Sequence, residues 1–78
     1  MNPGTADNKA ERTRRAIINL LARGPALTAD TLAERLKLSI LYVRPRVSEL
    51  VKRERIVANG DFGLNASGRM AKKWRVAR

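Results

Sequence analysis

Residues 27–57 read LTADTLAERLKLSILYVRPRVSELVKRERIV, and the spacing of the apolar residues in this stretch decides the fold. Thr28 can cap a short helix, expected over about residues 29–37, because its hydroxyl can accept a backbone N–H of the first turn. Ser39 can cap a second helix in the same way, after a turn at Leu38. Helical spacing then predicts the residues that the two helices bury: Leu32, Ala33 and Leu36 in the first, and Val43, Val47, Leu50 and Val51 in the second.

A longer helix is expected before this stretch. Apolar residues recur at helical spacing from about Asp7, and Gly24-Pro25 ends the pattern, the glycine as a C-terminal cap and the proline as a stop. Residues 1–6 have no apolar period, and we expect them to form a disordered tail. Residues 7–78 are then expected to form one domain, because a chain of 78 residues has room for a single small core.

Two strands are expected after the stretch. The first is Ile56-Val57-Ala58, which is rich in β-branched residues and is followed by a long polar connection over residues 59–67. In residues 70–77 the pattern has a period of two, which is typical of a strand. This alternation places Trp74 and Val76 toward the core.

The predicted order is helix, short extended piece, helix, helix, strand, loop, strand. Residues 27–57 resemble the helix-turn-helix core of the winged helix-turn-helix superfamily, on the spacing Ala33, Leu36, Leu38, Ser39, Val43, Val47 and Leu50. VRPRVSELVKRERIV, with NASGRMAKKWRV after it, resembles small winged-helix proteins found in bacteriophage and bacterial genomes. The resemblance covers nearly the whole chain after residue 10 and implies an α+β winged helix, in which three helices are followed by a two-stranded hairpin.

Composition narrows the classes of function. Seventeen Lys and Arg stand against seven Asp and Glu, so the formal net charge is +10 and an anionic partner is expected, with nucleic acid first. Histidine and cysteine are absent, which removes the usual general base and the usual metal ligands. We therefore expect a protein that is not an enzyme and that carries no metal and no cofactor.

The sequence also bears on location. No apolar run approaches the roughly 18 residues of a membrane span, so no membrane association is expected. The N-terminus, MNPGTADNKAER, lacks the apolar core of a signal peptide. These features predict a cytoplasmic protein, and the resemblance implies that the cell is bacterial or phage-infected.

The resemblance implies which side chains contact DNA. In the superfamily the third helix enters the major groove and the hairpin touches the flanking backbone. Arg44 and Arg46 are the candidates for reading base edges, because a guanidinium can bond guanine at two points, and Tyr42 and Ser48 would share that face. The candidates for phosphate contact are Ser39, Lys52, Arg69, Lys72 and Lys73.

Two of these assignments have alternatives. Arg44 and Arg46 could instead form a solvated face or pair with Glu49. Lys72 and Lys73 could be ordinary edge lysines that discourage strand pairing, and the alternation of the strand points Lys72 toward the core.

Pro45 falls on the sixth residue of the expected third helix. It cannot donate to the carbonyl of Leu41, and inside a regular helix it costs on the order of 3 kcal/mol. Either the first turn is kinked, or residues 39–43 are irregular and the regular helix begins near Arg44. We favour the second arrangement, because proline suits a first turn.

Ile40, Leu41 and Tyr42 are apolar where a DNA-reading helix is usually polar, and three roles stay open for them. They can contact thymine methyl groups, pack back onto the second helix, or form a patch for a partner protein or a second copy of the chain. The arginine pair that follows favours DNA. We therefore expect a small transcriptional regulator that binds double-stranded DNA, alone or as a homodimer. The alternatives are a phage-encoded protein that binds a host protein, such as a polymerase or nuclease, and an accessory of DNA replication or packaging.

Overall fold

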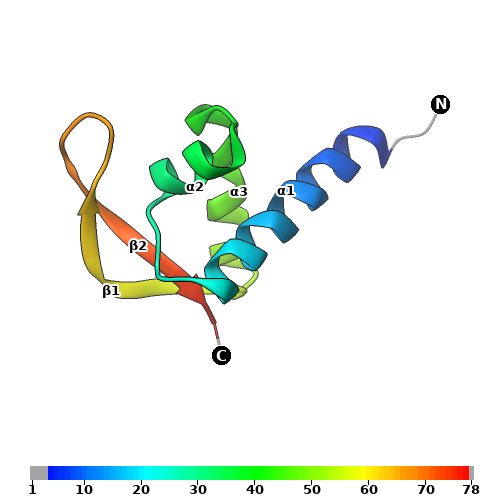
Figure 1. Ribbon diagram of the computed structural model, residues 1–78. Helices are drawn as coiled ribbons and strands as arrows, with labels where there is room; N and C mark the ends of the chain where they lie inside the picture. The colour runs from blue at the N-terminus through cyan, green and yellow to red at the C-terminus, as the bar shows by residue number, and fades with distance from the viewer. Residues whose placement is uncertain (1–3, 78) are drawn as a thin grey trace.

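The computed structural model describes the backbone of residues 4–77 and the side chains of residues 9–77. Three helices pack together, and an antiparallel two-stranded hairpin extends from one side of them (Figure 1). In chain order the elements are α1 (Gly4–Arg23), α2 (Ala29–Leu36), α3 (Ile40–Lys52), β1 (Ile56–Leu64) and β2 (Met70–Val76). This order confirms the α+β winged-helix fold expected from the sequence.

The first helix is longer than expected. α1 begins at Gly4, so it includes residues 4–6 of the segment expected to be a tail. Residues 1–3 of that segment lie outside the described residues. The helix ends at Arg23, directly before Gly24-Pro25, as the sequence predicts.

One apolar core lies where the three helices meet the start of the hairpin. Trp74 and Val76 pack against it, as the alternation predicts, and Leu36 is half-buried at its edge. Val51, which was expected inside, is 37 % exposed. It follows the buried Leu50 by about 100° around the helix axis and so points away from the core. The buried apolar residues of the described chain are Ile17, Leu21, Leu27, Leu32, Ala33, Val43, Val47, Leu50 and Ile56.

Both predicted helix caps are present. Thr28 Oγ1 accepts the N–H of Thr31 at 3.2 Å, and Ser39 Oγ accepts the N–H of Leu41 at 3.1 Å. Each such cap contributes about 1 kcal/mol to stability, because it satisfies a donor that the helix leaves open. Between the two helices Lys37 takes the left-handed conformation, with φ 58°, and ends α2. The turn that separates α2 from α3 is therefore set by local contacts.

The expectation that residues 39–43 are irregular is wrong. α3 is helical from Ile40 onward, and Pro45 lies inside it. The cap at Ser39 fixes the first turn, which holds the helix start ahead of the proline. The carbonyl left without its donor belongs to Leu41, which is 77 % exposed, so solvent can supply that hydrogen bond. Exposure of this turn reduces the cost of the proline.

The hairpin has longer strands than expected. β1 continues past the strand expected at residues 56–58 and ends at Leu64. Its pairing with β2 is interrupted at residues 59–61, which form a bulge, and resumes at Phe62. Gly60 in this bulge has φ +101°, a conformation that side chains rarely adopt. The polar composition of this region therefore marks a bulge and not one long loop.

Lys72 is exposed, although the alternation places it on the same face of β2 as Trp74. The outer half of the hairpin extends beyond the helices (Figure 1), so the face that covers the core at Trp74 meets solvent at Lys72. The opposite face of the hairpin turns toward α2 there. A Cβ atom on Gly63 would lie 3.2 Å from Cγ2 of Thr28.

The hairpin is tied to the helical part at two levels. Leu27 and Trp74 exchange two backbone hydrogen bonds, with N···O distances of 3.2 and 2.8 Å. This bridge confirms the short extended piece expected before α2. Farther out, the Ala66 N–H donates to Asp30 Oδ2 at 3.1 Å. The position of the hairpin relative to α2 and α3 is thus fixed by named contacts.

Candidate nucleic-acid interface

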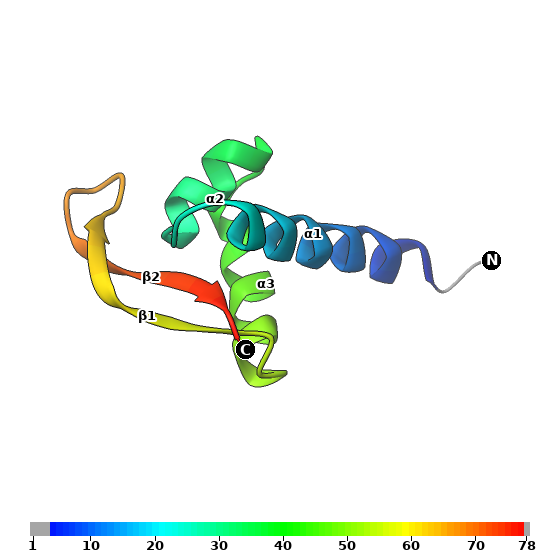
Figure 2. The same ribbon diagram turned by 60° about the horizontal axis from the view of Figure 1, so that its bottom comes forward.

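One side of α3 is open to solvent. Figure 2 shows the helix between the hairpin on one side and α1 on the other, and contacts to β1 and α1 cover these flanks. An exposed helix about 10–12 Å wide matches the width of the major groove of B-DNA. The exposed residues of α3 are Leu41, Arg44, Pro45, Ser48, Val51 and Lys52.

The flank of α3 that faces α1 holds a network of charged side chains. Arg46 donates to both carboxylate oxygens of Glu49, with Nε–Oε1 at 2.8 Å and Nη2–Oε2 at 2.7 Å. Arg14 of α1 donates from Nη1 to the same Oε1 at 2.7 Å and from Nη2 to Glu11 at 3.0 Å. Glu49 therefore joins two arginines from two helices.

Tyr42 completes this flank. Its ring lies under the guanidinium of Arg46, with 4.9 Å from Cζ to the ring centroid, and under the ammonium of Lys9, with 5.1 Å from Nζ to the centroid. A cation over an aromatic face is attracted by the quadrupole of the ring. Tyr42 and Arg46 are thus held toward α1 and away from the open side of α3.

The titration of Glu49 reflects the same contacts. The hydrogen bond from Arg46 lowers the pKa of the Glu49 carboxyl from its ordinary value, and the bond from Arg14 adds to this effect, while partial burial opposes it. The Glu49 hydrogen bond in turn raises the pKa of Arg46. Both groups are therefore charged at neutral pH, and the charge of Arg46 is compensated within the chain.

The four candidates for base contact are thus divided between two sides of α3. Arg44 and Ser48 lie on the open side, and Arg44 makes no ion pair with any of residues 9–77. Arg46 and Tyr42 lie on the α1 side. The pairing with Glu49 that was left open for both arginines is observed for Arg46.

The candidates for phosphate contact differ in how free their polar groups are. Lys52, Arg69 and Lys72 are exposed. Ser39 is exposed too, but its Oγ already accepts a backbone N–H as the cap of α3. Lys73 is half-buried and its Nζ lies 3.6 Å from Asp61 Oδ2.

The three apolar residues at the start of α3 also differ in how deeply they are buried. Ile40 is half-buried and packs against the core, which is the structural role considered for the group. Leu41 is 77 % exposed. The hairpin adds further exposed apolar side chains, among which Leu64 and Met70 face each other across the two strands. Of these, Leu64 lies across a cavity from Ile40 at the start of α3.

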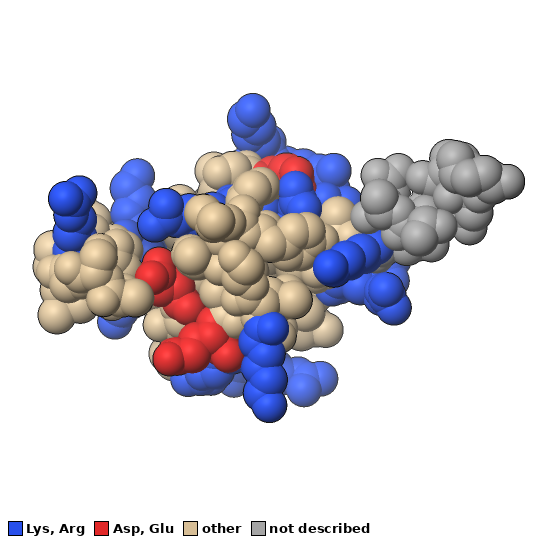
Figure 3. Space-filling model, turned by 90° about the horizontal axis from the view of Figure 1, so that it is seen from above, with Lys and Arg blue, Asp and Glu red and all other residues tan. Residues whose placement is uncertain are grey.

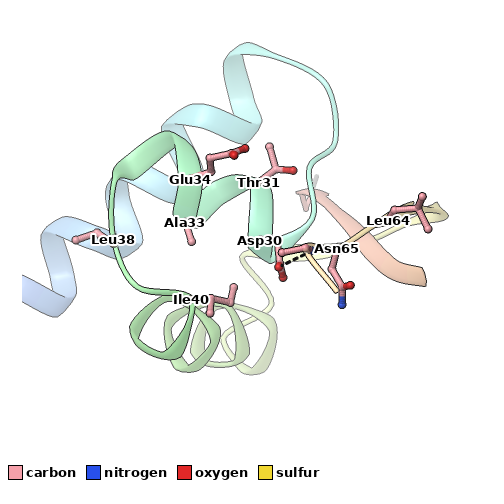
Figure 4. A pocket seen from close by; sticks show the side chains of 9 residues that line it. Asp30, Thr31, Ala33, Glu34, Leu38, Ile40, Leu64 and Asn65 are labelled. Carbon is pink, nitrogen blue, oxygen red and sulfur yellow. Dashed lines mark hydrogen bonds between the residues drawn. The ribbon is translucent and has the colours of Figure 1, made fainter. Parts of the chain in front are cut away.

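A cavity of about 390 Å³ separates the tip of α3 from the hairpin. Ile40 and Leu64 line it from either side, and Asp30 and Glu34 of α2 lie along it (Figure 4). Asp30 accepts the Ala66 N–H across this space. Two carboxylates repel a phosphate, so we expect phosphates to bind outside this cavity.

The basic residues are not confined to the open side of α3. Figure 3 shows Lys and Arg projecting from several sides of the molecule, with the acidic side chains between them. A second hollow, of about 250 Å³, lies between α1 and the C-terminal end of α3 and is lined by Arg14, Arg15, Arg53 and Arg55 together with Glu11. The charge excess therefore surrounds the interface and extends behind it.

No group of three metal-binding side chains occurs within residues 9–77. None of the described helices combines the length and the apolar character needed to cross a membrane.

Some features of this region were not accessible from the sequence. Arg14 is separated by 35 positions from Glu49, and no local pattern links the two. The pairing of Arg46 with Glu49 has a local signal, since residues three apart on a helix are neighbours.

Residues 11–57 match the model of a family described as winged helix-turn-helix DNA-binding. The matched segment contains most of α1, all of α2 and α3, and the start of β1, so it includes the open side of α3. Neither the comparison with curated proteins nor the comparison with solved structures gave a match.

Proposed function

Because this chain belongs to the winged helix-turn-helix DNA-binding family, we propose that it binds double-stranded DNA with the open side of α3 in the major groove and the hairpin along the flanking backbone. The observation that carries the proposal is the uncovered side of α3, on which Arg44 and Ser48 are free to reach base edges. The cationic hairpin residues Arg69 and Lys72 are exposed for contact with the backbone.

We assign the two sides of α3 different roles. Arg44 would donate to a guanine at two points, and Ser48, which can donate or accept, would contact a neighbouring base. Arg46 and Tyr42 would act indirectly, because their contacts with Glu49 and α1 hold α3 in its orientation. The hydrogen bonds to Glu49 occupy Nε and Nη2 of Arg46, and the side chain is only 17 % exposed, so a base contact by Arg46 would have to use Nη1 and the remaining N–H of Nη2.

Phosphate contact is proposed chiefly for Lys52, Arg69 and Lys72. Their ammonium and guanidinium groups carry no sequence information but fix the register of the protein on the duplex. Ser39 can still donate its hydroxyl hydrogen while it caps α3, and Lys73 is the weakest of the candidates because Asp61 lies beside it.

The regulatory role is the finer part of the proposal. A winged helix of this size covers about one half-site, so a regulator would bind two half-sites as a homodimer or accept modest specificity. We propose a small transcriptional regulator of a bacterium or phage, acting where that DNA lies, in the cytoplasm, by binding and without a catalytic step.

A protein partner is the second candidate function. Leu41, Phe62, Leu64 and Met70 are more than half exposed, and exposed apolar side chains can mark a contact surface. In that case, the partner would be a host protein or a second copy of this chain, and the DNA contacts would not depend on these residues.

Titration of labelled duplex fragments tests the proposal against this alternative. Arg44→Ala should weaken binding by about 1–3 kcal/mol, the usual cost of losing a bidentate base contact. Arg12→Ala is the control, because Arg12 is an exposed arginine on α1, outside the proposed contact set. Equal affinity of the two variants and the unchanged protein would count against the assigned DNA-contacting face.

A further inference from the structure

The open side of α3 has few groups that can hydrogen-bond a base. Arg44 and Ser48 are polar, and Lys52 lies at the C-terminal end of the helix. Leu41, Pro45 and Val51 on the same side are apolar. Arg46, which would have added donors, is bound to Glu49. Hydrogen bonding alone therefore offers little capacity to distinguish one sequence from another.

The apolar groups lie where a recognition helix meets the bases. Leu41, Pro45 and Ser48 are spaced by four and three positions, so they follow one line along α3. Leu41 is in the first turn, and the N-terminal residues of a recognition helix are those that contact base edges. Its side chain is not needed to fill the core, since the residue is 77 % exposed.

The charge of this side indicates what covers it. Arg44 and Lys52 flank the apolar residues, and the single acidic residue of α3, Glu49, lies on the other flank and binds two arginines. A surface that combines cations with apolar groups suits a polyanion that also presents apolar groups. In the major groove of DNA the apolar group is the C5-methyl of thymine.

We propose that Leu41, with Pro45 beside it, contacts thymine methyl groups in the major groove, so that the protein selects its sites largely by these methyl groups. This inference rests on the proposed DNA binding and names what that site recognises. A contacted methyl group contributes through burial of apolar surface, which corresponds to about fourfold in affinity for one group of this size. Several contacted thymines would multiply this factor.

Deoxyuridine provides the direct test, because it pairs as thymidine does and lacks the C5-methyl. Duplexes enriched from a random pool by the unchanged protein are resynthesised with deoxyuridine in place of thymidine, and both forms are titrated. The unchanged protein should bind the deoxyuridine form about fourfold more weakly for each contacted methyl group.

Leu41→Ala should reduce this difference toward onefold. Leu64→Ala is the matched control: it is the same substitution at a leucine of similar exposure, 67 % against 77 %, but on the hairpin. The Leu64→Ala variant should retain the full ratio of affinities for the thymidine and deoxyuridine duplexes. Because Leu41 is exposed, the variant should keep the amide spectrum of the folded protein.

The outcomes separate the two proposals. Equal affinity for both duplex forms, or an unchanged ratio in the Leu41→Ala variant, would overturn methyl recognition and leave DNA binding in place. Loss of the ratio in Leu64→Ala as well would also overturn the assignment to Leu41. Failure of the unchanged protein to bind any duplex would instead overturn the proposed function.

Discussion

Glu49 holds Arg46 through both carboxylate oxygens, at 2.8 and 2.7 Å, and thereby takes one of the two arginines of α3 out of the set available to a ligand. The same carboxylate binds Arg14 of α1 at 2.7 Å. The contact thus links the packing of the helices to the choice of residues that reach DNA.

Glu49→Gln should lower the free energy of unfolding by about 1–2 kcal/mol. The substitution removes charge-assisted hydrogen bonds to Arg46 and Arg14, and the value is at the low end because Glu49 is partly solvated. Urea unfolding measures the change. Glu34→Gln is the control, because Glu34 is exposed and forms no ion pair with any of residues 9–77. An equal effect of both substitutions would contradict the role of the network.

The stability of the fold should decrease at acidic pH. Hydrogen bonds from Arg46 and Arg14 lower the pKa of Glu49 below 4.5, and a hydrogen bond from Arg14 does the same for Glu11. A depressed folded-state pKa stabilises the fold above the unfolded pKa, and this contribution is lost as pH falls through the folded-state value. Unfolding midpoints should therefore be level near neutral pH and decrease below 4.5. The Glu49→Gln variant should show a shallower decrease, and an equally steep one would refute this origin of the acid sensitivity.

Arg44→Ala and Arg46→Ala should have opposite profiles. Arg44 is exposed, so its loss should weaken DNA binding about tenfold or more and leave the unfolding midpoint nearly unchanged. Loss of Arg46 leaves Glu49 with one partner fewer, so that variant should be less stable while its folded fraction retains more DNA affinity. The duplex affinity and the unfolding midpoint, measured for both variants, test this difference. A larger affinity loss in Arg46→Ala would restore Arg46 as a base-contacting residue.

The dependence of affinity on salt should report the phosphate contacts. Each phosphate neutralised by a cation contributes about −0.9 to the slope of log K against log salt concentration. Lys52→Ala and Lys72→Ala should each reduce this slope by about 1 and weaken binding to all sequences alike. Lys73→Ala should change it less, since Lys73 is half-buried beside Asp61. Slopes of the Lys52→Ala and Lys72→Ala variants equal to that of the unchanged protein would remove these two lysines from the interface.

The parts of the fold that could be predicted depend on local signals. A hydroxyl residue before an apolar period marks a helix start, and the caps at Thr28 and Ser39 lie where this rule places them. The order of helices and strands follows from periodicity in the same way. Family resemblance then supplies the open side of α3 as the expected interface.

Two of the features that the sequence does not predict depend on distant contacts, and a third, the start of α3, depends on local ones. At the start of α3, the cap at Ser39 and the exposure of Leu41 outweigh the preference of Pro45 for a first turn. The orientation of Arg46 depends on α1, which supplies Arg14 from far along the chain. The exposure of Lys72 depends on how far the hairpin extends past the helices, which alternation within one strand does not show.

Amide chemical shifts of the uniformly labelled protein, recorded during titration with a duplex selected from a random pool, test the central claim most directly. DNA binding by the open side of α3 predicts that the largest changes fall in the first turns of α3 and in the hairpin residues 65–73, and that they weaken as salt is added. A spectrum left unmoved by the duplex, or changes confined to α1 and the arginine-lined hollow behind α3, would contradict it.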